Sequence, residues 1–250
     1  MSPPPDPGGP AGETVRWRLR VAYDGSGFHG FAATDGHPTV GGALADALGR
    51  VTRSPVALTC AGRTDTGVHA LDQVVHFDLP AEASERLDPA ALVRSCNRQL
   101  GPAVVVREAA VAEPGFDARR SARSRRYRYL VVNAPVADPL LARISWHVSD
   151  PLDLRAMAAA ADALVGEHDF RAFCRRPPGA EPDYPLVRRV VDARWSRLYD
   201  PPRAPSGTPG PAAEGSRDGA RGAAHGSGEG APDGASTGRP VLAPVVGSLL

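Results

Sequence analysis

A short loop in the first half of the chain carries the side chains best suited to chemistry. In Ala61–Gly67 (AGRTDTG), two glycines flank Arg63-Thr64-Asp65, so the backbone can turn sharply and present these side chains outward. Arg63 lies two residues from Asp65, close enough for its cation to keep the carboxylate ionised. A charged Asp on such a loop is suited to act as a nucleophile. Spacing alone favours a simpler alternative, a hairpin with a surface Arg–Asp pair.

A dense run of arginines interleaved with tyrosines follows at 119–129. All 29 basic residues of the chain are Arg, and six of them lie between positions 119 and 128, although the net charge is only +1. If the run is a strand, Arg123, Arg125, Tyr127 and Tyr129 share one face. That face would offer guanidinium groups to phosphates beside rings on which a base can stack. A solvated Arg-rich edge strand with core tyrosines is an alternative of equal standing.

The remaining polar groups show no comparable pattern. His69 and His76 are an odd number of residues apart in one predicted strand, which places them on opposite faces and argues against a shared metal ion. The three cysteines are widely spaced, without the Cys-x-x-Cys spacing of zinc sites, and indicate a reducing compartment. No glycine-rich phosphate-binding motif is present. We therefore expect no metal and no cofactor.

The loop must be positioned by the elements around it. Strict alternation predicts a strand over 15–23, and Thr39 caps a predicted helix that runs through Arg53. A short strand is predicted at 55–60, and a third runs from the loop to about Phe77. Asp88-Pro89 begins a second helix that stops at Gly101-Pro102, before a strand at 104–111. The order β-α-β-β-α-β is that of a ferredoxin-like unit.

The second half begins a similar α/β unit. We predict a strand over 123–133, a helix that opens at Asp150-Pro151 and stops at Gly166, and a strand over 187–199. A cleft between two such domains is the natural arrangement. The expected fold class is α+β, with two ferredoxin-like domains built on antiparallel sheets and the second domain incomplete.

Composition sets the limits of these domains. The chain has 250 residues with 27 Gly and 26 Pro, concentrated in the first 13 residues and in 201–240, where no large apolar residue occurs. We predict a disordered tail over 1–13, domains over 14–113 and 114–200, a disordered stretch over 201–240 and a short final segment over 241–250. No apolar run is long enough for a membrane span or a signal peptide, so a cytoplasmic location without membrane contact is expected.

Six short blocks stand out along residues 15–195. They are Tyr23–Phe28 (YDGSGF), Ala61–Ala70 (AGRTDTGVHA), Gln73–Phe77 (QVVHF), Phe116–Arg119 (FDAR), Arg126–Tyr129 (RYRY) and Gly166–Phe170 (GEHDF). In this order and at matching spacing, they resemble the tRNA pseudouridine synthase A family, and the AGRTDxGVHA block is highly specific.

The resemblance implies an isomerase, usually a homodimer, that converts uridine to pseudouridine at positions 38–40 of the tRNA anticodon stem-loop without a cofactor. By match to the family's motifs, Asp65 would be the catalytic nucleophile. Arg63 would help to extrude the uridine and hold the pocket, and Tyr127 would stack on the flipped base. The arginine cluster, with Arg119, Arg123, Arg125 and Arg126, would then contact tRNA phosphates.

The C-terminal part departs from this pattern. The family has a block that carries a cleft Arg and opens a helix, and the best match here is Val241–Leu250, with Ala243 in the place of that Arg. The stretch 201–240 replaces the strand before it, and relatives continue beyond the position of Leu250. Two alternatives to an active enzyme follow. One is a non-catalytic tRNA-binding remnant of this family, and the other is a truncated product without function.

Overall fold

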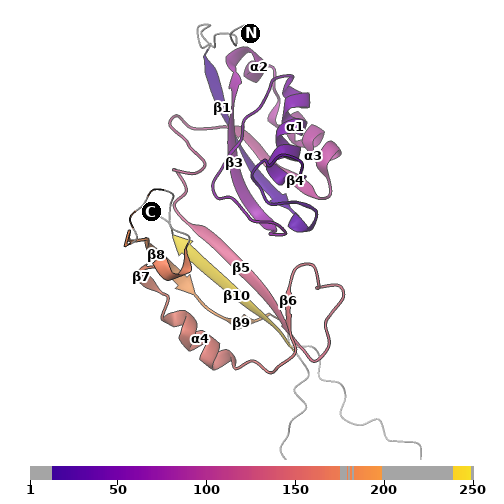
Figure 1. Ribbon diagram of the computed structural model, residues 1–250. Coiled ribbons are helices and arrows are strands. Elements are labelled where there is room, and N and C mark those ends of the chain that lie inside the picture. Colours follow the sequence, from indigo (N-terminus) through magenta and orange to yellow (C-terminus); the bar gives the residue numbers. More distant parts are fainter. Residues whose placement is uncertain (1–12, 175–178, 180, 182, 199–238, 249–250) are drawn as a thin grey trace, which may run out of the picture. The chain divides into compact units, whose positions relative to one another are not determined.

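The computed structural model (Figure 1) describes residues 13–174, 179, 181 and 183–198 and the backbone of 239–248. The chain divides between Arg125 and Arg126 into two compact units. Both contain helices and sheets of mainly antiparallel strands, so the fold is of the α+β class. No helix within these described residues is long and apolar enough to cross a membrane. The predicted disordered stretches, 1–13 and 201–240, lie almost wholly outside them.

The first unit is a four-stranded antiparallel sheet with two long helices on one face (Figure 1). The strands lie in the order β2-β3-β1-β4, with β1 paired to both β3 and β4. In chain order the elements are β1 (Thr14–Tyr23), a 3-10 turn (Gly25–Gly27), α1 (Val40–Thr52), β2 (Thr59–Cys60), β3 (Ala70–Pro80), α2 (Ala81–Glu85), α3 (Pro89–Leu100) and β4 (Val104–Val111).

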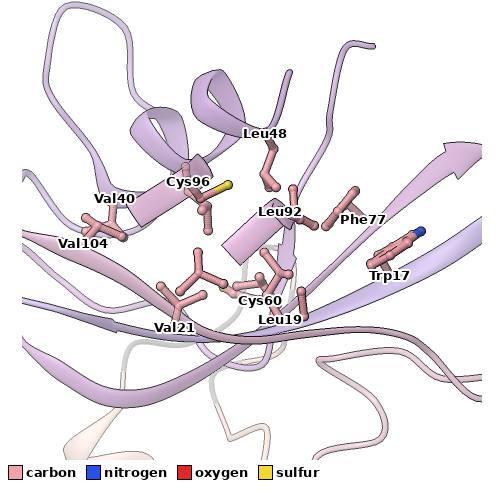
Figure 2. Close-up of a cluster of buried hydrophobic side chains, with 14 of the residues drawn as sticks. Trp17, Leu19, Val21, Val40, Leu48, Cys60, Phe77, Leu92, Cys96 and Val104 are labelled. Atoms are coloured by element: carbon pink, nitrogen blue, oxygen red, sulfur yellow. The ribbon is translucent and has the colours of Figure 1, made fainter. Parts of the chain in front are cut away.

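The core of this unit lies between the sheet and its helices. Trp17, Leu19 and Val21 alternate along β1 and are all buried, as the sequence pattern predicts. Figure 2 shows these side chains gathered with others from the helices and from β2, β3 and β4, among them Leu48, Phe77 and Leu92. The arginines between the buried positions of β1 form ion pairs with carboxylates of β3 and β4. The start of β3, where the 61–69 loop enters the sheet, therefore lies beside the end of β1, with Tyr23 paired to Ala70.

Both long helices of the first unit begin at the predicted residues. The Thr39 hydroxyl accepts a hydrogen bond from the Gly42 amide at 3.2 Å, and the Asp88 carboxylate accepts from the amides of Ala90 and Ala91. Each cap satisfies amides that a helix leaves without partners in its first turn. These local signals are strong enough to fix a helix start from sequence.

The predicted strand at 55–60 is shorter in the structure. Only Thr59 and Cys60 pair with β3, opposite His76 and Val75. Pro55 has no amide to donate to a strand partner. Val56 and Leu58 pack against the hydrophobic core but do not pair with β3. The five-residue helix α2 was not predicted from the sequence.

The second unit contains a mixed sheet with strand order β6-β5-β10-β8-β7, and β9 also pairs with β10. Its elements are β5 (Arg125–Asn133), whose first residue belongs to the first unit, β6 (Trp146–Val148), α4 (Leu154–Asp162), β7 (Gly166–Asp169), a 3-10 turn (Arg171–Phe173), β8 (Val187–Ala193), β9 (Ser196–Arg197) and β10 (Arg239–Ser248). The pairing of β5 with β6 is parallel, whereas we expected antiparallel sheets throughout.

The helix of the second unit starts later than predicted. Asp153, and not Asp150, is its cap, because the Asp153 carboxylate accepts from the amides of Arg155 and Ala156. The helix ends at Asp162, and the residues from Gly166, where we placed the stop, begin β7, which pairs with β8. A cap is defined by which carboxylate reaches the free amides, and composition alone does not separate Asp150 from Asp153.

Residues 239–248 form strand β10, which corrects the expectation of a helix at 241–250. Pro240 and Pro244 disfavour a helix interior, and three valines favour a strand. β10 lies between β5 and β8 and pairs with Ala193 through Val245 and with Ser196 through Leu242. The interruption between β8 and β9 coincides with Pro244, which has no amide to donate.

Candidate active site

The 61–69 loop joins β2 to β3 and carries Asp65 at an exposed position. Within the described parts of the chain, the Asp65 carboxylate takes part in no hydrogen bond or ion pair. The Asp65 backbone carbonyl does accept a hydrogen bond, from the Val68 amide at 3.2 Å. The carboxylate is therefore accessible to a substrate, while the backbone that bears it is tied into a turn.

A glycine-rich segment, residues 24–31, packs backbone to backbone against this loop. The Phe31 amide donates to the Thr64 carbonyl at 3.0 Å, and the Gly67 amide donates to the Phe28 carbonyl at 3.3 Å. A Cβ atom on Gly25 would lie 2.1 Å from the Val68 carbonyl oxygen. On Gly30, whose φ of +86° itself favours glycine, a Cβ would lie 2.7 Å from the Thr64 carbonyl oxygen. The close approach therefore requires glycine at both positions.

Two buried polar side chains reach the same loop from the sheet. The hydroxyls of Tyr23, at the end of β1, and Thr64 are 2.8 Å apart and share a hydrogen bond. The side-chain amide of Gln73, on β3, donates to the Gly62 carbonyl at 2.6 Å and to the Tyr23 hydroxyl at 3.4 Å. The residues on both sides of Arg63 are thus bonded to the sheet. Sequence reasoning assigned no role to Tyr23, Gln73 or Gly25, although all three lie in the blocks Tyr23–Phe28 and Gln73–Phe77 that resemble the family.

The expected pairing of Arg63 with Asp65 is not present. Both side chains are exposed, and the described residues include no ion pair between them. An ion pair between two solvated side chains gains little free energy over separate hydration. The carboxylate is thus left free of the cation that we expected beside it.

Arg63, Arg119 and Arg125 gather instead around Cys60, at the base of the loop. Burial raises the pKa of the Cys60 thiol, and the positive charges of these three arginines partly offset that effect. Three of the predicted site arginines therefore lie near enough to Cys60, at the start of the Asp65 loop, for their charges to act on its thiol. Phosphate is a group that such positive charge favours.

Arg125 is part-buried rather than displayed to solvent. One of its terminal guanidinium nitrogens donates to the Ala61 carbonyl, and its Nε atom is buried without a hydrogen-bond partner among the described residues. That Nε lies 3.0 Å from where a Cβ on Gly62 would be. A Cβ on Gly62 would therefore require the Arg125 side chain to shift by a few tenths of an ångström.

The segment that carries Arg119 is anchored to the first unit. The buried His76 ring accepts a hydrogen bond from the Ala118 amide at 2.9 Å, and Arg16 donates to the Phe116 carbonyl at 2.7 Å. The Asp117 carboxylate caps the Arg119 and Arg120 amides, which contribute to holding its pKa below the usual range. These contacts explain why residues 114–125, expected in the second domain, belong to the first compact unit.

The remaining predicted residues are exposed. Arg123 and Arg126 are solvent-exposed, and Tyr127 and Tyr129 on β5 of the second unit expose 47% and 62% of their surfaces. Alternation along β5 places the two rings on one face. Rings this exposed are available for stacking, and they do not fit the alternative of core tyrosines. His69 and His76 have separate partners, and no cluster of three potential metal ligands occurs in the described part of the chain.

Comparison with known proteins gives a consistent result. The chain is 51% identical over 181 residues to the tRNA pseudouridine synthase A of Frankia casuarinae, an alignment that covers 71% of this chain and 64% of that protein. It is 48% identical to the Aromatoleum aromaticum protein of the same name, covering 74% of this chain and 68% of the relative. The Mycobacterium leprae protein is 42% identical, with 74% and 67% covered.

The match thus spans slightly under two-thirds of the length of the Frankia relative and slightly over two-thirds of the other two. No family model matches the chain. Identity of 42–51% over some 70% of the chain leaves one assignment: the chain belongs to the tRNA pseudouridine synthase A family.

Proposed function

We propose that this protein isomerises uridine to pseudouridine in tRNA, at positions 38–40 of the anticodon stem-loop. The observation that carries the proposal is Asp65, an exposed carboxylate free of described partners on a loop whose backbone is held on two sides. The names of the relatives support the reaction and the class of RNA. The three arginines around Cys60 support binding of a phosphate backbone next to that loop.

In the proposed reaction the Asp65 carboxylate adds to the uridine, either at C1′ of the ribose or at C6 of the base. The N1–C1′ bond breaks, the base rotates, and a C5–C1′ bond forms. C5 then loses its proton, N1 gains one, and the carboxylate is released. Atoms and electrons balance within the nucleotide, so the isomerisation needs no oxidant, reductant or cofactor.

The other site residues have supporting roles in this proposal. Uridine must leave the stack before its glycosidic bond can be attacked, so Arg63 helps to extrude it and Tyr127 stacks on the flipped base. Arg119, Arg123 and Arg126 contact phosphates, a sequence-neutral and salt-sensitive interaction. Arg125 makes its described contact with the loop, and its contribution to tRNA binding is correspondingly smaller.

The architecture that we propose is two ferredoxin-like domains with a cleft between them, in a cytoplasmic homodimer. The strand order β2-β3-β1-β4 of the first unit, with its helices on one face, supports a ferredoxin-like assignment for that unit. The dimer rests on the resemblance to the family, the cleft on that resemblance and on the order of predicted elements, and the location on composition.

The test compares wild-type protein with Asp65→Ala and Asp65→Asn on unmodified tRNA, with pseudouridine in the anticodon arm measured by mass spectrometry. We expect product from wild type only. Because the Asp65 carboxylate has no described partner to lose, the melting temperatures should be unchanged. Product from either variant would reject Asp65 as the nucleophile.

One observation favours a second candidate function. Ala243 stands on β10 where the family has a cleft Arg, so a tRNA-binding protein without catalysis is the alternative. It predicts salt-sensitive tRNA binding by wild type with no pseudouridine formed.

A further inference from the structure

Two polar side chains lie buried beneath the candidate nucleophile loop without a place in the proposed reaction. Tyr23 is 5% exposed and Gln73 is 9% exposed. The β1–β3 register shifts between Val21 and Tyr23, an irregularity of the kind that redirects a side chain at the end of a strand. Burial of a hydroxyl and an amide is unfavourable unless both form hydrogen bonds. Their partners therefore indicate what the two side chains are for.

Those partners lie almost wholly in the loop. The Tyr23 hydroxyl bonds Thr64, the residue directly before Asp65, and the Gln73 amide bonds the carbonyl of Gly62, the residue directly before Arg63. The 3.4 Å bond between Gln73 and Tyr23 joins the two contacts into one network. The network therefore fixes the backbone on the N-terminal side of Asp65, while the Gly25–Phe31 segment fixes the other side.

We infer that Tyr23 and Gln73 are positioning residues, which act through Thr64 and Gly62 to hold Asp65 in the orientation needed for attack. This inference rests on the proposed function, since it assigns the network a role in that reaction. Neither residue touches the substrate. A displacement of about 1 Å in a reacting group can reduce a rate by about 100-fold, so the loss of one bond in this network should affect turnover.

The test uses Tyr23→Phe and Gln73→Met, each of which removes hydrogen-bonding atoms and keeps most of the side-chain volume. Ser84→Ala is the matched control, because the Ser84 hydroxyl accepts a buried 2.9 Å hydrogen bond from Trp17 in the same unit but contacts no residue of the loop. Melting temperature, kcat and KM for tRNA are measured for all of them.

We expect the melting temperatures of Tyr23→Phe and Ser84→Ala to fall by similar amounts. Only Tyr23→Phe and Gln73→Met should lose kcat, by about 10- to 100-fold, with KM for tRNA close to wild type. Thr64→Val should lower kcat as much as Tyr23→Phe. The double variant Tyr23→Phe/Thr64→Val should lose little more kcat than either single variant, because both substitutions remove the same hydrogen bond. A kcat for Tyr23→Phe equal to that of Ser84→Ala would overturn the inference.

A second measurement separates this inference from the proposed function. If wild type forms no pseudouridine, the proposed reaction fails, and amide hydrogen exchange tests the network alone. Faster exchange at Ala61, Gly67 and Val68 in Tyr23→Phe than in Ser84→Ala supports positioning of the loop. Equal exchange in the two variants overturns it.

Discussion

The tightest contact with the candidate nucleophile loop is at Gly25, and Gly25→Ala is the most direct test of that contact. The new Cβ would lie 2.1 Å from the carbonyl oxygen of Val68, 2.5 Å from its carbonyl carbon and 3.0 Å from the carbonyl carbon of Gly67. All three atoms belong to the backbone, so no change of rotamer relieves the overlap. To reach ordinary contact near 3.4 Å, the loop must move away by about 1.3 Å.

This displacement sets the size of the expected effect. Overpacking of a tight site costs about 1–3 kcal/mol of the free energy of unfolding, with the upper end expected where the clash is with backbone. Movement of the loop by more than 1 Å also moves Asp65, so kcat should fall by about 100-fold. Urea unfolding measures the first quantity, and single-turnover formation of pseudouridine on saturating tRNA measures the second.

Gly27→Ala is the matched control for Gly25→Ala. Gly27 lies in the same 3-10 turn, but a Cβ built on it meets no atom within 4 Å. This variant should keep wild-type stability and turnover. Our reasoning is refuted if Gly25→Ala also behaves as wild type, or if both variants lose stability equally, since the cause would then be strain in the backbone of the turn and not the contact.

Three further predictions concern stability and tRNA binding. Burial lowers the pKa of His76 below 6.5. The contribution of neutral His76 to the free energy of unfolding is therefore complete above pH 6.5 and is lost as the pH falls toward the folded-state pKa. His76→Asn should flatten this part of a urea-unfolding pH profile. Arg119→Gln and Arg126→Gln should each weaken tRNA binding and reduce the slope of log K against log salt by about 1, measured by filter binding. Thr39→Ala removes the cap of α1 and should cost about 1 kcal/mol in thermal unfolding, whereas no change would show that the 3.2 Å bond is not stabilising.

Local patterns in the sequence were sufficient for much of the first unit. The alternation around Trp17 and Leu19 and the caps at Thr39 and Asp88 depend on neighbours within a few residues, and the structure confirms them. The short extent of β2 and the strand at 239–248 depend on which distant strand supplies a partner. Proline was informative in both cases, since Pro55 and Pro244 mark positions where the ladder is absent or interrupted.

The same distinction holds for the candidate site. Asp65 could be singled out because its glycine-flanked loop is contiguous in sequence. Tyr23 and Gln73 each begin a block that resembles the family, but their role could not be predicted, because their common target becomes visible only when β1 and β3 pair. Gly25 lies in the first of these blocks, and its role follows from a close approach to a loop some forty residues later in the chain.

The described contacts also explain how an exposed loop can hold a candidate nucleophile without binding its carboxylate. The carbonyls of Ala61, Gly62 and Thr64 accept hydrogen bonds from Arg125, Gln73 and the Phe31 amide. All of these bonds are made to backbone acceptors, so the side chains of Arg63 and Asp65 stay free of them. An ion pair between those two side chains would have to be broken before either could meet a nucleotide. Rigidity supplied through the backbone avoids that step.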